Sequence, residues 1–262
     1  MRQLFFAIVL LLGVSACSTG QTKKEEKKET VKETSNFDNT LAQATASPDT
    51  VKSKNANEFQ SSKEETEEDR ARKLKMRRAR TAFKNGVEYS KRGEMGKAKD
   101  AFKTVLEYDP QNDRACSNLG SIYYKMGQKD IALAYYEDAF RINPEDSASM
   151  VGAGLILFEK KDYDGALEYY IMAIKKAPRY ALAYYNRGTL LGYQNNYGGA
   201  LTDMNRAIEI DPNNSKYYMN RGLANHYLKR QQQACDDWEK AASMGNAEAQ
   251  KALRLYCRKI EK

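Results

Sequence analysis

The chain has 262 residues, with 43 Lys and Arg against 35 Asp and Glu, for a formal net charge of +8. Residues 70–80 carry seven positive charges and no negative one, so the rest is nearly balanced and a general polyanion binder is not expected. The single histidine, His226, lies in no Cys, Asp and His set with zinc-ligand spacing, so neither a metal nor another cofactor is expected.

The first residues have the pattern of an export signal. Arg2 precedes an apolar run over residues 4–14, which is too short to span a membrane and has the length of a secretory signal. The following VSAC sequence, which ends at Cys17, resembles the bacterial lipobox. This resemblance implies that residues 1–16 are removed and that lipid on Cys17 anchors the chain in the bacterial outer membrane, facing the periplasm or the outside. The alternative is an ordinary signal peptide that happens to contain a cysteine.

Residues 17–63 are expected to be a tether that follows the lipidated cysteine. They are rich in Ser, Thr, Lys, Glu, Asn and Gln and contain almost no large apolar residue. Such a segment cannot bury enough surface to offset its ordering entropy. A flexible chain of this length has a root-mean-square span of roughly 35–40 Å.

The charge then changes sign within a segment that we assign to a lead-in helix over residues 64–78. Residues 64–69 are mainly acidic and residues 70–80 mainly basic. Acidic residues are favoured at a helix N-terminus. One interpretation is a helix that leads into the next domain and caps it; the other is a basic strip for an acidic partner or an anionic headgroup.

A fixed 34-residue period runs through the remaining chain. It links four prolines: Pro110, Pro144, Pro178 and Pro212. It also links Gly86, Gly120, Gly154, Gly188 and Gly222, and the large residues Phe102, Tyr136, Tyr170, Met204 and Trp238. Such a period is typical of a solenoid in which each unit buries its apolar face against the next. The period predicts five units over residues 79–248: 79–112, 113–146, 147–180, 181–214 and 215–248.

These landmarks resemble those of the tetratricopeptide repeat (TPR), a 34-residue helix–turn–helix unit. The unit at 113–146 matches best, with Leu119-Gly120, Tyr123, Ala132, Tyr136, Ala139 and Pro144. The resemblance implies an all-α fold, a right-handed superhelical solenoid of five helix–turn–helix repeats. Small residues such as Gly120 let two helices approach closely, and the large residue at 136 fills the space beside that contact. The first-helix Tyr becomes Leu157, Leu191 and Asn225 in later units, so packing there should differ in detail.

The chain is expected to close with a capping helix over residues 249–262. Gly245-Asn246 stand where a fifth proline would fall and turn the chain into this helix. Cys235 and Cys257 lie on the two helices that meet at this turn, so they could form a disulfide in an oxidising compartment. The alternative is two buried thiols. Cys116 is expected to be a core thiol.

In TPR proteins the first helices line a concave groove, and the resemblance implies which residues would contact a partner there. These are Phe83, Arg114, Asn118, Tyr124, Phe158, Tyr185, Asn186, Tyr193, Lys216, Asn220 and Tyr227. Asn recurs at the sixth position of three units, where its amide could both donate to and accept from a peptide backbone, although Asn is also simply common there. The fifth position is never Lys, so the carboxylate clamp of chaperone-binding TPRs is absent.

No constellation of residues indicates catalysis. There is no Gly-rich phosphate loop and no Ser with a plausible base, and acidic pairs such as Asp236-Asp237 are expected to be solvated carboxylates. The sequence therefore favours a membrane-anchored adaptor that binds an envelope protein in its groove, without nucleic acid or a small-molecule substrate. Two other hypotheses are a self-assembling structural component of an envelope complex and an envelope enzyme or glycan-binding module.

Overall fold

The structure, a computed structural model, describes residues 66–257. These residues form eleven helices and no strand. The helices are α2 (Glu67–Lys91), α3 (Met95–Tyr108), α4 (Asp113–Lys125), α5 (Lys129–Ile142), α6 (Ser147–Glu159), α7 (Tyr163–Lys176), α8 (Ala181–Tyr193), α9 (Tyr197–Ile210), α10 (Ser215–Tyr227), α11 (Gln231–Ser243) and α12 (Ala247–Tyr256). The predicted all-α repeat solenoid is therefore confirmed.

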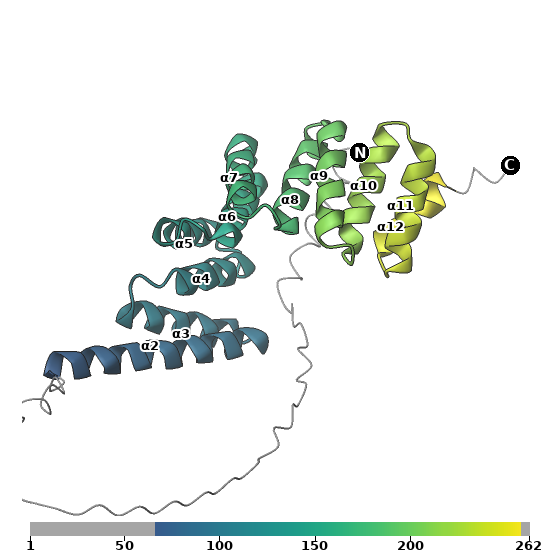
Figure 1. Cartoon of the computed structure of the whole chain (residues 1–262). Helices are drawn as coiled ribbons and strands as arrows, with labels where there is room; N and C mark the ends of the chain where they lie inside the picture. Colours follow the sequence, from purple (N-terminus) through teal and green to yellow (C-terminus); the bar gives the residue numbers. More distant parts are fainter. Residues whose placement is uncertain (1–65, 258–262) are drawn as a thin grey trace, which may run out of the picture.

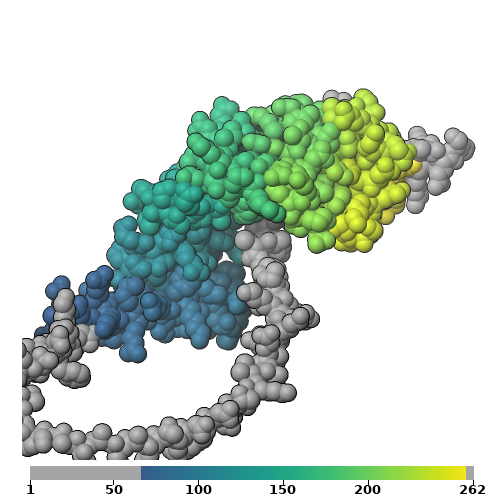
Figure 2. Space-filling model, in the orientation of Figure 1, coloured from purple at the N-terminus to yellow at the C-terminus, as the bar shows by residue number. Residues whose placement is uncertain are grey.

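The helices stack in five pairs along one curved array, and α12 lies against the last pair (Figure 1). Helices α4, α6, α8 and α10 begin at the first residues of the predicted units, 113, 147, 181 and 215. Each of the four periodic prolines lies two residues beyond the end of a second helix, as expected for a residue that cannot continue a helix. The space-filling view shows the elongated body, with the N-terminal helices at one end and α12 at the other (Figure 2).

Helix α2 is longer than the others because it combines the predicted lead-in helix with the first helix of the first unit. It begins at a capping box, in which the Thr66 hydroxyl accepts from the Asp69 backbone N–H at 3.1 Å and the Asp69 carboxylate accepts from the Thr66 backbone. The N-terminal part of α2 extends past the rest of the array (Figure 1). The predicted signal peptide, Cys17 and the tether lie outside the described residues.

The turn inside each unit requires a left-handed backbone at a single position. Residues with φ between 65° and 77° recur there every 34 residues: Gly93, Gly127, Lys161, Asn195 and Lys229. Glycine and asparagine tolerate this conformation, so their residue type accounts for the turns at Gly93, Gly127 and Asn195. The two lysines carry no such signal, so at these units the rest of the repeat determines the turn.

Each unit is held together by a close approach between the glycine of its first helix and a large residue of its second helix. An ideal Cβ on Gly120 would lie 2.7 Å from Tyr136 Cδ1, and one on Gly152 of the next first helix would lie 2.5 Å from Tyr136 Cζ. The Tyr136 ring is thus held between glycines of α4 and α6. The pairs Gly86–Phe102, Gly154–Tyr170, Gly188–Met204 and Gly222–Trp238 repeat the contact within units.

The first helices form the inner side of the array. Helices α4, α6, α8 and α10 contact one another in succession, whereas the second helices of consecutive units have little or no contact with one another. Closer spacing on one side bends a stack of units, as is usual for solenoids.

Among residues 66–257, no helix has both the length and the apolar content needed to cross a bilayer.

We expect Gly120→Ala to lower the free energy of unfolding by about 1–3 kcal/mol, because the new methyl group would overlap a ring that is held from both sides. Urea denaturation measures this change. Gly96→Ala is the matched control: nothing lies within 4 Å of its Cβ position on α3, so it should stabilise the helix by up to about 1 kcal/mol. Equal effects of the two substitutions would contradict the assigned contact.

Candidate partner-binding face

The structure buries four of the residues that the sequence places in the groove. Phe158 is 9% exposed, Tyr185 4%, Asn186 6% and Asn220 1%. The Tyr185 ring packs 5.2 Å from that of Tyr217, within the core that joins the fourth and fifth units. The prediction that these four offer an accessible surface is wrong, because their positions lie where consecutive first helices stack.

The recurrent asparagines mostly serve the fold. Asn220 Nδ2 donates to Thr189 Oγ1 at 3.1 Å, and Thr189 in turn donates to the Tyr185 carbonyl at 2.7 Å. The Asn118 amide donates to the Arg114 carbonyl of its own helix at 2.7 Å. Within the described residues, Tyr185 Oη and Asn220 Oδ1 are buried and have no hydrogen-bond partner. Burial, and to a lesser extent the neighbouring Tyr217, raises the pKa of Tyr185.

The remaining predicted residues lie at least partly open along the first helices. Arg114 is exposed and its guanidinium lies 4.9 Å from the Phe83 ring centre, which joins the inner sides of α2 and α4. The Tyr124 hydroxyl donates to Glu159 across α4 and α6. Lys216 is half-buried, and this burial lowers its pKa. Tyr193 and Tyr227 are half-buried on α8 and α10.

Tyr193 and Tyr227 belong to a repeated contact that the sequence analysis missed. The first residue of a second helix meets the last residue of the next unit's first helix. In this contact the ring centres of Tyr163 and Tyr193 are 5.1 Å apart, and those of Tyr197 and Tyr227 stack at 4.6 Å. We call these four residues the tyrosine ladder. Residues 163 and 197 are one 34-residue period apart, as are residues 193 and 227. This repetition of tyrosine is the sequence feature from which the contact could have been predicted.

The same contact is ionic nearer the N-terminus. Lys129 Nζ lies 2.8 Å from Glu159 Oε2, at the positions that correspond to Tyr163 and Tyr193 one unit later. The edge of the inner face therefore changes from charged to aromatic along the array. A hydrogen bond with Tyr193 raises the pKa of Tyr163 to about 12, so this hydroxyl is neutral at physiological pH. A neutral tyrosine combines an apolar ring with a hydroxyl that can donate or accept.

Two acidic residues of the second helices, Asp203 and Asp237, are buried in ion pairs. Asp237 is 5% exposed and accepts from Arg221 Nη2 at 2.6 Å, which corrects the expectation that it is solvated. Asp203 and Arg187 make the corresponding pair one unit earlier, at 2.7 Å.

Burial raises the pKa of the free Cys116 thiol to about 11. Among the described residues, no cluster of His, Cys, Asp or Glu could hold a metal ion.

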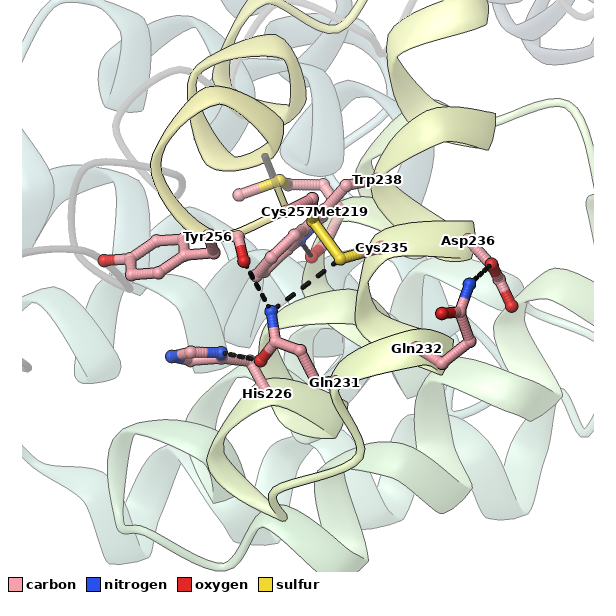
Figure 3. The surroundings of a disulfide bond; sticks show 9 residues. All are labelled: Met219, His226, Gln231, Gln232, Cys235, Asp236, Trp238, Tyr256 and Cys257. Atoms are coloured by element: carbon pink, nitrogen blue, oxygen red, sulfur yellow. Dashed lines mark hydrogen bonds between the residues drawn. A yellow bond between two sulfur atoms is a disulfide. The ribbon is translucent and has the colours of Figure 1, made fainter. Parts of the chain in front are cut away.

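The C-terminal end is closed by a disulfide and an aromatic cluster (Figure 3). Cys235 on α11 and Cys257 at the end of α12 are bonded, with Cα atoms 5.9 Å apart. Gln231 links the same helices: its Nε2 donates to the Tyr256 carbonyl and its Oε1 accepts from His226 Nδ1, both at 3.0 Å. The His226 ring also packs 4.6 Å from that of Tyr256. The only histidine is therefore part of the cap.

Comparisons with known proteins identify the repeat. Models described as tetratricopeptide repeat match residues 79–112, 117–181 and 181–214. No curated protein sequence matches the chain.

Several solved structures resemble the fold. PilF of Pseudomonas aeruginosa is 17% identical, with a TM-score of 0.63 over 70% of this chain and 86% of that chain. A MamA protein is 22% identical, with a TM-score of 0.54 over 69% of this chain and 96% of that one. YrrB, described as a TPR protein with an unusual peptide-binding site, is 21% identical, with a TM-score of 0.52 over 64% of this chain and 88% of its own. At these identities the likeness shows the fold alone.

We expect Cys257→Ser to lower the free energy of unfolding by about 2–4 kcal/mol, because the bond constrains residues 22 apart in the unfolded chain. Denaturation with and without reductant measures this, and reductant should have no effect on the variant. The chain without residues 1–17 has three cysteines. After denaturation it should take one alkyl label without reductant and three with it; three labels in both cases would contradict the bond.

Proposed function

Because the chain belongs to the tetratricopeptide repeat family, we propose that it is a non-catalytic adaptor that binds a segment of a partner protein along its first helices. The observation that carries this proposal is the tyrosine ladder, which gives two successive unit junctions a half-buried aromatic edge. Tyrosine provides a large contact area at little entropic cost and is enriched at binding surfaces.

The surface suits an extended segment better than a small molecule. Accessible groups extend from Arg114 on α4 to Tyr227 on α10, through four units of the array. Charged groups lie at the α4–α6 junction and aromatic groups at the next two. We infer a partner segment with polar or charged residues at one end and apolar residues at the other. The peptide-binding site described for YrrB agrees with this use of the fold.

The adaptor would act at a membrane of the bacterial envelope. This part of the proposal rests on the sequence: the apolar run over residues 4–14 and the lipobox-like sequence that ends at Cys17. Several acyl chains on Cys17 would anchor the protein firmly, since each buried CH₂ contributes roughly 0.8 kcal/mol. The cap disulfide is consistent with an oxidising compartment.

Site-specific photocrosslinking in intact cells tests the binding face. A photoreactive phenylalanine analogue at residue 193 should give an adduct with a partner protein, whereas the same group in place of Ile171 should not. Ile171 is the control because it is 47% exposed on α7 and lies eight residues beyond Tyr163, about 12 Å along that helix at 1.5 Å per residue.

Competition makes the crosslinking test quantitative. Added wild-type chain should suppress the adduct, and a competitor with Tyr193→Ser and Tyr227→Ser should be roughly tenfold weaker or worse, as is usual when aromatic hot spots are truncated. Equal adducts from residues 171 and 193 would contradict the binding face. An adduct between two copies of this chain would instead support the self-assembly hypothesis.

Metabolic labelling with an alkyne fatty acid tests the anchor. The wild type should incorporate the label and sediment with membranes. Cys17→Ser should lose the label and leave the membrane fraction, whereas Cys116→Ser should keep both because Cys116 is a buried thiol of the array. Labelling that persists in Cys17→Ser would show that another residue carries the lipid.

A further inference from the structure

The positive charge of the protein is concentrated in one helix. Residues 70–91 of α2 contain nine Lys and Arg and one acidic residue, Glu88. Their net charge of +8 equals the formal charge of the whole chain, so all other residues together sum to zero. A concentration of like charge in one element indicates a specific electrostatic contact better than a uniformly basic surface does.

Four of these cations form a row along one face of α2. Arg70, Arg77, Lys84 and Lys91 are seven residues apart, so they share one face of α2 and span about 31 Å at 1.5 Å per residue. The buried residues of α2 are Ala79, Ala82 and Gly86. At 100° per residue the cations point roughly 180° away from these three. We call Arg70, Arg77, Lys84 and Lys91 the α2 stripe; Lys73 and Arg80 flank it.

The α2 stripe is open and its charges are not neutralised within the described residues. All four side chains are exposed, and none makes an ion pair with another described residue. Glu88, which lies on the same face, is held by Arg92 at 3.1 Å. On the opposite face of α2, the buried Gly86 lies against Phe102 of α3, so α3 packs on the side away from the stripe. Leu74, whose side chain is 50% exposed, lies beside the stripe.

We propose that the α2 stripe docks the array lengthwise on an anionic phospholipid surface. A row of cations along one face of a helix can contact a plane of lipid phosphates, and Leu74 beside it can enter the headgroup region. A lipid surface is favoured over a soluble acidic partner by position: only 49 residues separate Cys17 from the start of α2. A flexible chain of this length has a root-mean-square span of roughly 35–40 Å, so the proposed anchor would keep the stripe near the bilayer.

Docking would also orient the protein. The stripe lies at the N-terminal end of the array, and the tyrosine ladder lies on α7 to α10, farther along it. With α2 flat on the lipid, the remaining units extend away from the membrane (Figure 1). The binding face would then be held at a defined height and direction. The choice of lipid as the source of phosphate rests on the proposed anchor. The position and exposure of the stripe do not depend on that anchor.

Vesicle flotation with the chain lacking residues 1–17 tests the stripe without the lipid anchor. All described core clusters lie within residues 66–257, so this chain retains the contacts of the fold. The probes are phosphatidylcholine vesicles with and without 30% phosphatidylglycerol. The stripe variant carries Arg70→Gln, Arg77→Gln, Lys84→Gln and Lys91→Gln. The matched control carries Lys125→Gln, Lys175→Gln, Arg179→Gln and Lys240→Gln, which removes four exposed cations elsewhere.

We expect the wild type to bind only the anionic vesicles. The stripe variant should bind roughly several hundred-fold more weakly, at about fivefold per lost cation, and the control variant within about threefold of wild type. Binding should weaken as salt rises. Circular dichroism should show equal helix content in all three proteins.

Three results would overturn the proposal. They are equal losses in the two variants, equal binding of wild type to neutral vesicles, and tighter binding of wild type to duplex DNA or polyglutamate than to anionic vesicles at equal negative charge. Because this assay lacks Cys17, it is independent of the fatty-acid labelling that tests the anchor. Failure of one therefore does not imply failure of the other.

Discussion

The fold depends on the close approach of two helices at one glycine in each unit. A large side chain of the second helix lies over that glycine at a distance that no Cβ would permit, as Tyr136 does over Gly120. Dense packing of this kind leaves little freedom in how the helices cross. Tyr136 also reaches Gly152 of the next unit, so the same side chain sets the packing within a unit and the stacking between units.

Tight stacking decides which inner residues remain available for binding. Tyr185 and Asn220 lie where first helices meet, and both are buried there. The contact between the start of a second helix and the end of the next first helix stays partly open. Side chains vary at this contact, from the Lys129–Glu159 pair to stacked tyrosines, where they are only partly buried. The array can therefore keep one fold while its edge changes chemistry along its length.

The fold was predictable because its landmarks are local and periodic. Proline beyond a helix, glycine in a turn and glycine under a ring act through short-range sterics, and four first helices begin where the period places them. The site was predictable only in part. Position within a unit indicates that a side chain lies on a first helix, but not whether the neighbouring unit covers it. Asp237 shows the same limit: its burial depends on Arg221, sixteen residues away on another helix.

The sequence by itself determined the repeat, its register, the first residues of helices α4, α6, α8 and α10, and the concentration of charge in residues 70–91, because these follow from residue type and spacing along the chain. Only the tertiary structure decided which inner side chains are accessible, that Arg70, Arg77, Lys84 and Lys91 face away from α3, and that tyrosines 34 residues apart form equivalent contacts. Burial and direction depend on how two units stack, and stacking is a property of pairs of helices that no single segment contains.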